Sequence, residues 1–428
     1  METKKHDRRD RVQNLLIVLL SVSAVLLFAQ TQMVNLDLSW SDGRFSSLLN
    51  PTAPAGTPDV TTLADLAAPI HVVVSGQDGR CGMFYTTTAN ASLSRMSTLL
   101  GSALGSAGTW TECGDDAFRA ALNGGVYFDF LGDLPLSLLG ELLGTDGAGA
   151  AQLSARQVVL YPGEENVRLY IRDETGICRT CSTAVQSPVL STELATYRAN
   201  GAFFAFEGGD AFGGLDPYTP LTPEPLSYPV LSVANSLSDS TALLRQLEFN
   251  PYTNSRYTEK GGAEVIVGGS SRTLRLEPDG TVIYSAADGD DTLSISSSGD
   301  AVTASEAVLG ARSLAEAMLS GQLGEAALYL EEISAVEDGW LVRFGFQLDG
   351  MPVRFSSGSC GAEFYLTGNA VSRLTLRFRQ YTSTAEVSPL LPLTQAVAVM
   401  TQKWPGARLA ASYVDAGGAS ASLSWLAD

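Results

Sequence analysis

Residues 339–348 read Gly-Trp-Leu-Val-Arg-Phe-Gly-Phe-Gln-Leu, and this stretch decides the fold class. Large apolar side chains occupy every second position from Trp340 onward, and successive side chains of a strand point to opposite faces of a sheet. The alternation therefore predicts a strand with one buried face. Turn sequences containing Asp and Gly lie on both sides of it, so its neighbours are expected to pair with it antiparallel.

Two similar groups of elements follow each other in the C-terminal half of the chain. The first group has a helix at residues 237–247 and strands at 263–267, 273–276 and 281–284. The second group begins with a helix that has Ser305 as its expected N-cap. Its helices are expected at 305–319 and 393–403, and its strands at 327–336, 339–348, 362–366, 371–381, 408–414 and 421–425. The repeated order predicts two related helix-plus-meander modules.

The N-terminal half mixes short apolar strands with helices. Strands are expected at 70–74, 126–130, 157–161 and 167–171, and helices at 91–103 and 188–197. The whole pattern predicts an α+β fold with antiparallel sheets in three outer domains. Their expected limits are 59–232 for the N-terminal domain, 233–303 for the middle domain and 304–428 for the C-terminal domain.

The first 58 residues predict a membrane anchor and a spacer. Residues 1–11 carry five basic side chains, residues 12–34 carry no charge, and residues 35–58 end in a Pro-rich stretch. An uncharged run of this length spans the roughly 30 Å of a bilayer core, and the basic tail is expected to stay in the cytoplasm. A cleaved signal peptide is the alternative, with Ala29-Gln30-Thr31 as the nearest match to a cleavage site. The prediction is a single-pass protein of the cell membrane whose bulk is extracellular.

Composition excludes some classes of partner. The 428-residue chain has 46 acidic and 27 basic residues, which gives a net charge of −19. A hydrophobic content of 45% with only 17% charged residues indicates a globular chain and not a disordered one. Because an acidic surface repels phosphate groups, nucleic acid is not an expected partner.

The sequence shows no catalytic, cofactor-binding or metal-binding constellation. His71 is the one histidine beyond the tail, and its apolar surroundings favour a structural strand residue over a catalytic base. Cys178 and Cys181 have the spacing of a redox or metal pair, but too few further ligands accompany them for zinc. A structural disulfide or inert thiols are favoured there, and three pairings are open once Cys81 and Cys113 are included. These observations favour a binding or regulatory role.

One strand of the last module suggests a contact surface. Arg373, Arg377 and Arg379 occupy alternate positions and are expected on one face, where they could receive an acidic partner. The alternative is that they pair with carboxylates of neighbouring strands, such as Glu331 or Glu363.

Several segments of this chain resemble the YycH family of Firmicutes. They include the basic tail with its anchor, residues 262–284 with the core Thr-Leu-Arg-Leu-Glu-Pro-Asp-Gly-Thr-Val, and five motifs of the final module. Those motifs are Leu328-Tyr329-Leu330, Asp338-Gly339-Trp340, Asp349-Gly350-Met351-Pro352-Val353, Arg379-Gln380-Tyr381-Thr382 and Leu390-Leu391-Pro392-Leu393-Thr394-Gln395-Ala396. The final module also resembles YycI. The resemblance covers the anchor and the two C-terminal modules, and is weaker over residues 51–229.

The resemblance implies a membrane-anchored extracytoplasmic regulator of the sensor histidine kinase YycG (WalK), which controls cell-wall metabolism with the response regulator YycF. It also implies three outer domains, the last two related in fold, and contact with the kinase through the transmembrane helix, often beside YycI. Small residues in the anchor, Ser21, Ser23 and Ala24, would allow close approach of helices. The prediction is a non-enzymatic regulatory protein that needs no cofactor. The alternatives are an envelope adaptor that binds peptide or wall polymer, and an extracytoplasmic hydrolase or thiol enzyme.

Overall fold

The computed structural model describes the part of the chain that follows the expected anchor and spacer. The described residues are 63–76, 78–87, 90–145, 153–223, 226–237, 240–252, 255–268, 272–286, 293–295 and 302–427. The expected anchor at residues 12–34, with Ser21, Ser23 and Ala24, lies outside them. Among the helices that are described, none has the length and apolar character needed to cross a membrane.

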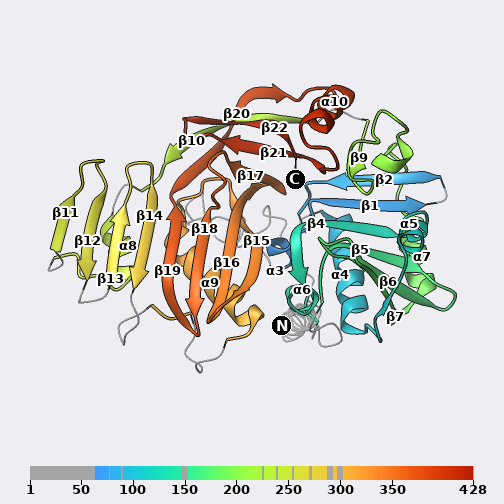
Figure 1. Cartoon of the computed structure of the whole chain (residues 1–428), viewed down its shortest axis with the longest axis horizontal. Coiled ribbons are helices and arrows are strands. Elements are labelled where there is room, and N and C mark those ends of the chain that lie inside the picture. Colours follow the sequence, from blue (N-terminus) through green and yellow to red (C-terminus); the bar gives the residue numbers. More distant parts are fainter. Residues whose placement is uncertain are drawn as a thin grey trace, which may run out of the picture. The chain divides into compact units, whose positions relative to one another are not determined.

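The first half of the chain builds a seven-stranded sheet in the order β2-β1-β4-β5-β6-β7-β3, and all of its paired strands are antiparallel (Figure 1). Its strands are β1 (His71–Gly76), β2 (Gly79–Phe84), β3 (Thr111–Glu112), β4 (Val126–Pro135), β5 (Ser154–Pro162), β6 (Asn166–Arg172) and β7 (Cys178–Gln186). The accompanying helices are α3 (Leu63–Leu66), α4 (Ala91–Gly105), α5 (Asp115–Ala121), α6 (Leu136–Leu142) and α7 (Ser187–Leu194). A short segment with β8 (Phe203–Phe204), η2 (Ala205–Glu207) and β9 (Pro220–Leu221) follows α7.

Both faces of the seven-stranded sheet are covered. On β4, Val126 and Phe128 pack into a cluster with residues of α4 and α6, whereas Tyr127 packs on the opposite face with Phe118 of α5 and with Tyr218. Successive apolar residues are therefore needed along the strand, which explains its near-continuous apolar sequence.

The second half of the chain builds a thirteen-stranded sheet in the order β11-β12-β13-β14-β19-β18-β16-β17-β21-β22-β10-β20, with β15 paired to β16. Its pairs are antiparallel except for β17 with β21, which is parallel. The strands are β10 (Ser227–Asn235), β11 (Ser255–Thr258), β12 (Glu264–Gly268), β13 (Arg272–Leu276), β14 (Thr281–Ala286), β15 (Ala327–Val336), β16 (Gly339–Leu348), β17 (Met351–Phe355), β18 (Ala362–Thr367), β19 (Ala370–Arg377), β20 (Arg379–Pro389), β21 (Leu409–Asp415) and β22 (Ser420–Ala427). The expectation of an α+β fold with mostly antiparallel sheets is confirmed.

The middle and C-terminal modules share this one sheet. β14 pairs with β19, so the expected boundary between residues 303 and 304 does not separate two sheets. The expected end of the N-terminal domain, residue 232, falls inside β10, and this strand pairs with β20 and β22 of the large sheet. The pairing of β14 with β19 removes one exposed edge from each meander.

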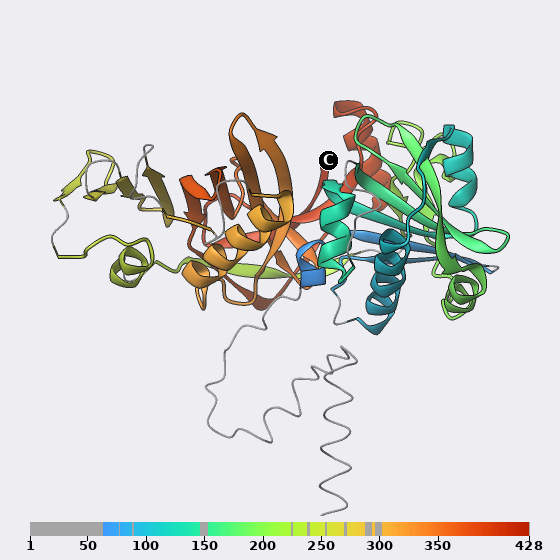
Figure 2. The same cartoon turned by 90° about the horizontal axis from the view of Figure 1, so that it is seen from below.

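Helices lie on the large sheet where the sequence places them. They are α8 (Ser240–Gln246), α9 (Ala304–Leu319) and α10 (Leu393–Lys403). α9, drawn in orange in Figure 2, contacts β15, β16 and β18. Its N-cap is Thr303 and not Ser305, because Thr303 forms a capping box in which Glu306 donates its backbone N–H to Thr303 Oγ1 at 3.2 Å. Ser305 lies inside the first turn.

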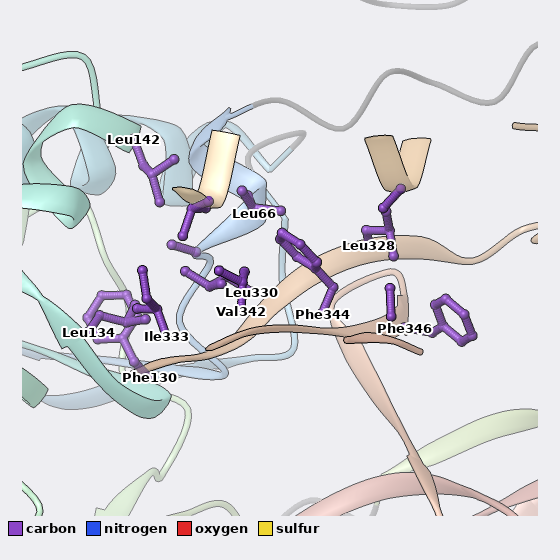
Figure 3. Close-up of a cluster of buried hydrophobic side chains, with 14 of the residues drawn as sticks. Leu66, Phe130, Leu134, Leu142, Leu328, Leu330, Ile333, Val342, Phe344 and Phe346 are labelled. Carbon is purple, nitrogen blue, oxygen red and sulfur yellow. The ribbon is translucent and has the colours of Figure 1, made fainter. Parts of the chain in front are cut away.

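One apolar core continues from the first sheet into the second. Phe130 and Leu134 of β4 lie beside Ile333 of β15, and Leu66 of α3 lies near Leu330 (Figure 3). All of these side chains are buried, so the two sheets meet across a packed apolar contact.

Candidate interaction surface

Arg373 and Arg377 keep the expected face of β19, but they differ in exposure. Arg373 is exposed, opposite Ser285 of β14 and Tyr365 of β18. Arg377 is half-buried, with its guanidinium 5.0 Å from the centre of the Phe355 ring, and it donates a hydrogen bond to the Thr281 hydroxyl at 3.1 Å. Arg373 is therefore the more accessible cation of the two.

Arg379 does not share this face, which corrects the expectation of three aligned arginines. β19 ends at Arg377, and Phe378, whose backbone N–H donates to the Gly280 carbonyl, lies between β19 and β20. Arg379 then begins β20 and is buried, and its Nε and Nη2 donate to the two carboxylate oxygens of Asp415 at 3.0 and 2.7 Å. Phe378 and Arg379 are both buried, so the break between the two strands resets the alternation and Arg379 lies in the interior.

The carboxylates expected as alternative partners bind other arginines. Arg343 lies between Glu363, at 2.8 Å, and Glu332, at 2.7 Å. Glu331 forms an ion pair with Arg354. Arg377 forms a loose ion pair with Asp279 at 3.9 Å. Among the described residues, the long cationic side chains of this sheet are thus largely matched within it, with the exposed Arg373 as an exception.

Cys178 and Cys181 do not face each other, which corrects the expectation of a disulfide between them. Both belong to β7, and residues three positions apart on a strand point to opposite faces. Cys178 packs with Phe118 and Tyr218, whereas Cys181 packs in the main core on the other face. Burial raises the pKa of each thiol to about 11, so neither resembles the reactive thiolate of a redox enzyme.

His71 is a satisfied strand residue, as the sequence indicates. It is buried in β1, with Nδ1 3.3 Å from a carboxylate oxygen of Asp129 and Nε2 3.4 Å from the Tyr85 hydroxyl. The Tyr85 hydroxyl also accepts the backbone N–H of Ala411 at 2.6 Å. Since Ala411 lies in β21, the Tyr85 hydroxyl connects His71 of the first sheet to the second sheet through hydrogen bonds.

A buried polar cluster, here the Asp129 cluster, forms around this histidine. Its members are Asp129, His71, Arg156, Arg408 and Tyr127. Arg408, next to β21, forms an ion pair with Asp129 and donates to the Tyr127 hydroxyl at 3.0 Å. Arg156 lies 3.7 Å from Asp129. Burial by itself raises the pKa of Asp129. Arg408, the hydrogen bond with His71, and Arg156 together lower the pKa by more than burial raises it, so the pKa of Asp129 lies below its usual value.

Sequence reasoning missed an exposed apolar surface around α10. Val399 and Leu391 have 54% and 53% of their surface exposed, and Trp404 has 42%. Two hollows of about 370 and 180 Å³ flank this helix, and both are lined by Met400 and Trp425. Position 399 lies about 200° around the helix from position 397. The pattern Val-Ala-Val, which places one valine in the core and the other outside, could have indicated this exposed apolar surface.

No protein-family model and no curated protein sequence matches this chain. The structure is similar to the crystal structure of YycH from Bacillus subtilis, with a TM-score of 0.53 and 12% sequence identity, over 85% of this chain and 94% of that one. The chain has the YycH fold. A match this long extends beyond the two C-terminal modules into residues 59–232, where the sequence resemblance was weak. The resemblance to YycH is therefore confirmed at the level of the fold.

Proposed function

We propose that this protein is a membrane-anchored regulator of a sensor histidine kinase of the YycG (WalK) type, and that it controls cell-wall metabolism by protein contact. The observation that carries the proposal is the YycH fold over 94% of the length of that protein. A companion of the YycI type is the second proposed partner. The buried thiols and the fully packed His71 are consistent with a non-enzymatic role.

Regulation by contact requires unequal affinity for two kinase states. A bound partner shifts the equilibrium between signalling states only by the difference in its affinity for them. We propose that the anchor, with its small residues Ser21, Ser23 and Ala24, contacts the kinase helices inside the membrane. Outside the membrane, the exposed Arg373 offers a cation to an acidic partner surface.

Reconstitution with the kinase in lipid vesicles tests this function. Full-length protein is expected to change the phosphorylated fraction of the kinase. The equilibrium constant between the two signalling states is expected to change by about 5–150-fold. The kinase is first isolated by pull-down from host membranes. The transfer of radioactive phosphate to the kinase is then measured with and without the protein.

Two variants test the proposed contact inside the membrane and the proposed contact outside it separately. A chain whose residues 12–34 are replaced by an unrelated apolar span of equal length should lose most of the effect. Arg373→Glu should weaken it without changing the fold, since Arg373 is exposed. If no histidine kinase is recovered and phosphorylation is unchanged by the intact protein, the regulatory proposal fails and an envelope adaptor becomes the better explanation.

We further propose that the described domains lie outside the cell, behind one membrane span at residues 12–34. Protease added to intact protoplasts should then digest the bulk of the chain, while a tag placed before residue 12 stays protected. Lysed protoplasts provide the control, because there the tag should be digested too. Protection of the C-terminal modules in intact protoplasts would contradict this topology.

A further inference from the structure

The structure brings two cysteines together that are 65 positions apart in the sequence, Cys113 and Cys178. β3 pairs with β7 in the register Thr111↔Thr180 and Glu112↔Arg179. One step further along, this register places Cys113 opposite Cys178, and the Cys113 backbone N–H donates to the Cys178 carbonyl at 3.0 Å. Both are free thiols.

The geometry of such a pair suits a disulfide. Directly opposed residues of an antiparallel pair that share a hydrogen bond have Cα atoms about 5.5 Å apart, and their side chains point to the same face. Disulfides span Cα distances of about 4.4–6.8 Å. Cys113 and Cys178 also pack against the same cluster, which contains Phe118 and Tyr218.

We propose that Cys113 and Cys178 form a disulfide when the protein meets a small-molecule or protein disulfide as oxidant. The Cys113 thiolate attacks one sulfur of the oxidant, and the other sulfur leaves as a thiolate. Cys178, deprotonated in turn, attacks the Cys113 sulfur and releases the second thiolate. Two protein thiols are oxidised to one disulfide, one external disulfide is reduced to two thiols, and the two protons pass to the departing sulfurs.

The other cysteines are excluded by position. Cys181 lies on the opposite face of β7, and Cys81 lies on β2, at the opposite edge of the seven-stranded sheet from β3. Cys360 lies near β18 of the large sheet. Of the single bonds that the three pairings left open by the sequence contain, Cys113–Cys178 is the one we propose.

The disulfide would link the short edge strand β3 covalently to β7. β3 has only two residues, and both are exposed. α5 begins two residues after Cys113 and supplies Phe118 to the cluster on this face. A covalent link from Cys113 to β7 would therefore keep α5 and its cluster on the sheet, and it would also restrict the unfolded chain.

Peptide mapping of the full-length protein tests the proposal. The folded protein is treated with oxidised glutathione, its remaining thiols are alkylated, and it is digested with trypsin. Arg179 separates Cys178 from Cys181, so each of the five cysteines falls in its own tryptic peptide. The expected product is peptide 96–119 joined to peptide 173–179, absent after reduction. Recovery of both peptides in alkylated form, or a link from 173–179 to 180–198, would overturn the proposal.

Thermal unfolding gives a second readout. Oxidation should raise the apparent Tm of the wild-type protein by about 5 °C. Cys113→Ser should abolish the gain, and the matched variant Cys81→Ser should keep it. Burial raises the pKa of the Cys113 thiol, so oxidation should also become about tenfold faster per pH unit between pH 7 and 8. An equal Tm gain in Cys113→Ser and wild type would contradict the assignment.

Discussion

Asp129→Asn is expected to lower the free energy of unfolding by about 3–5 kcal/mol at pH 7. Asp129 is 1% exposed, and its carboxylate faces the buried Arg408, with Arg156 and His71 beside it. Removing the negative charge leaves two guanidinium groups without their shared counter-ion. Breaking a buried ion pair by removing one partner costs far more than the pair itself contributes, because the remaining charge stays desolvated.

Asp133→Asn is the matched control on the same strand. Burial raises the pKa of Asp133, so the fold disfavours its ionised form, the opposite of Asp129. The amide oxygen of an asparagine can still accept the Glu174 backbone N–H that the Asp133 carboxylate accepts at 3.2 Å. We expect Asp133→Asn to remain within about 0.5 kcal/mol of wild type or to be more stable. Urea unfolding of both variants measures the contrast.

The dependence of this contrast on pH follows from the lowered pKa of Asp129. A carboxyl whose pKa is lower in the folded than in the unfolded protein contributes stability that is present above its unfolded pKa, about 3.9. That contribution is lost as the pH falls through the folded value. The difference between wild type and Asp129→Asn should therefore be constant from pH 5 to 7 and shrink below about pH 4. A difference that is small at pH 7 would show that Arg408 and Arg156 do not depend on Asp129.

Local sequence patterns predicted elements, but not how the elements join. The apolar spacing of residues 393–403 gives α10 with the observed bounds, and the alternation at residues 339–348 gives β16. The pairing of β14 with β19 joins strands almost a hundred residues apart. No local pattern encodes such a pairing, because many edges of similar composition compete for each strand.

The candidate sites failed where a tertiary feature overrides periodicity. Leu374, Leu376 and Phe378 continue one alternation, so the break between β19 and β20 at Phe378 cannot be seen in the sequence, and the alternation predicts the wrong environment for Arg379. The spacing of Cys178 and Cys181 resembles a redox pair only if the segment is a turn or a helix terminus. On a strand the same spacing separates the two thiols.

Arg379→Met is expected to destabilise the protein by about 3–5 kcal/mol, because it would leave the Asp415 carboxylate buried without its cation. Asp415 is 1% exposed and accepts two hydrogen bonds from Arg379 and one from the Tyr381 hydroxyl at 2.9 Å. Tyr381 and the Gly417 backbone N–H still donate in the variant, but neither carries a charge.

Arg373→Met is the control that separates stability from partner contact. Arg373 is exposed on β19, so its replacement should change the free energy of unfolding by no more than about 0.5 kcal/mol. We expect denaturant unfolding to distinguish the two variants, and the kinase assay to be sensitive to Arg373→Met while its fold is intact. If Arg379→Met instead unfolds like wild type and loses the regulatory effect, Arg379 acts at the partner surface after all. The buried ion pair with Asp415 would then be dispensable for the fold.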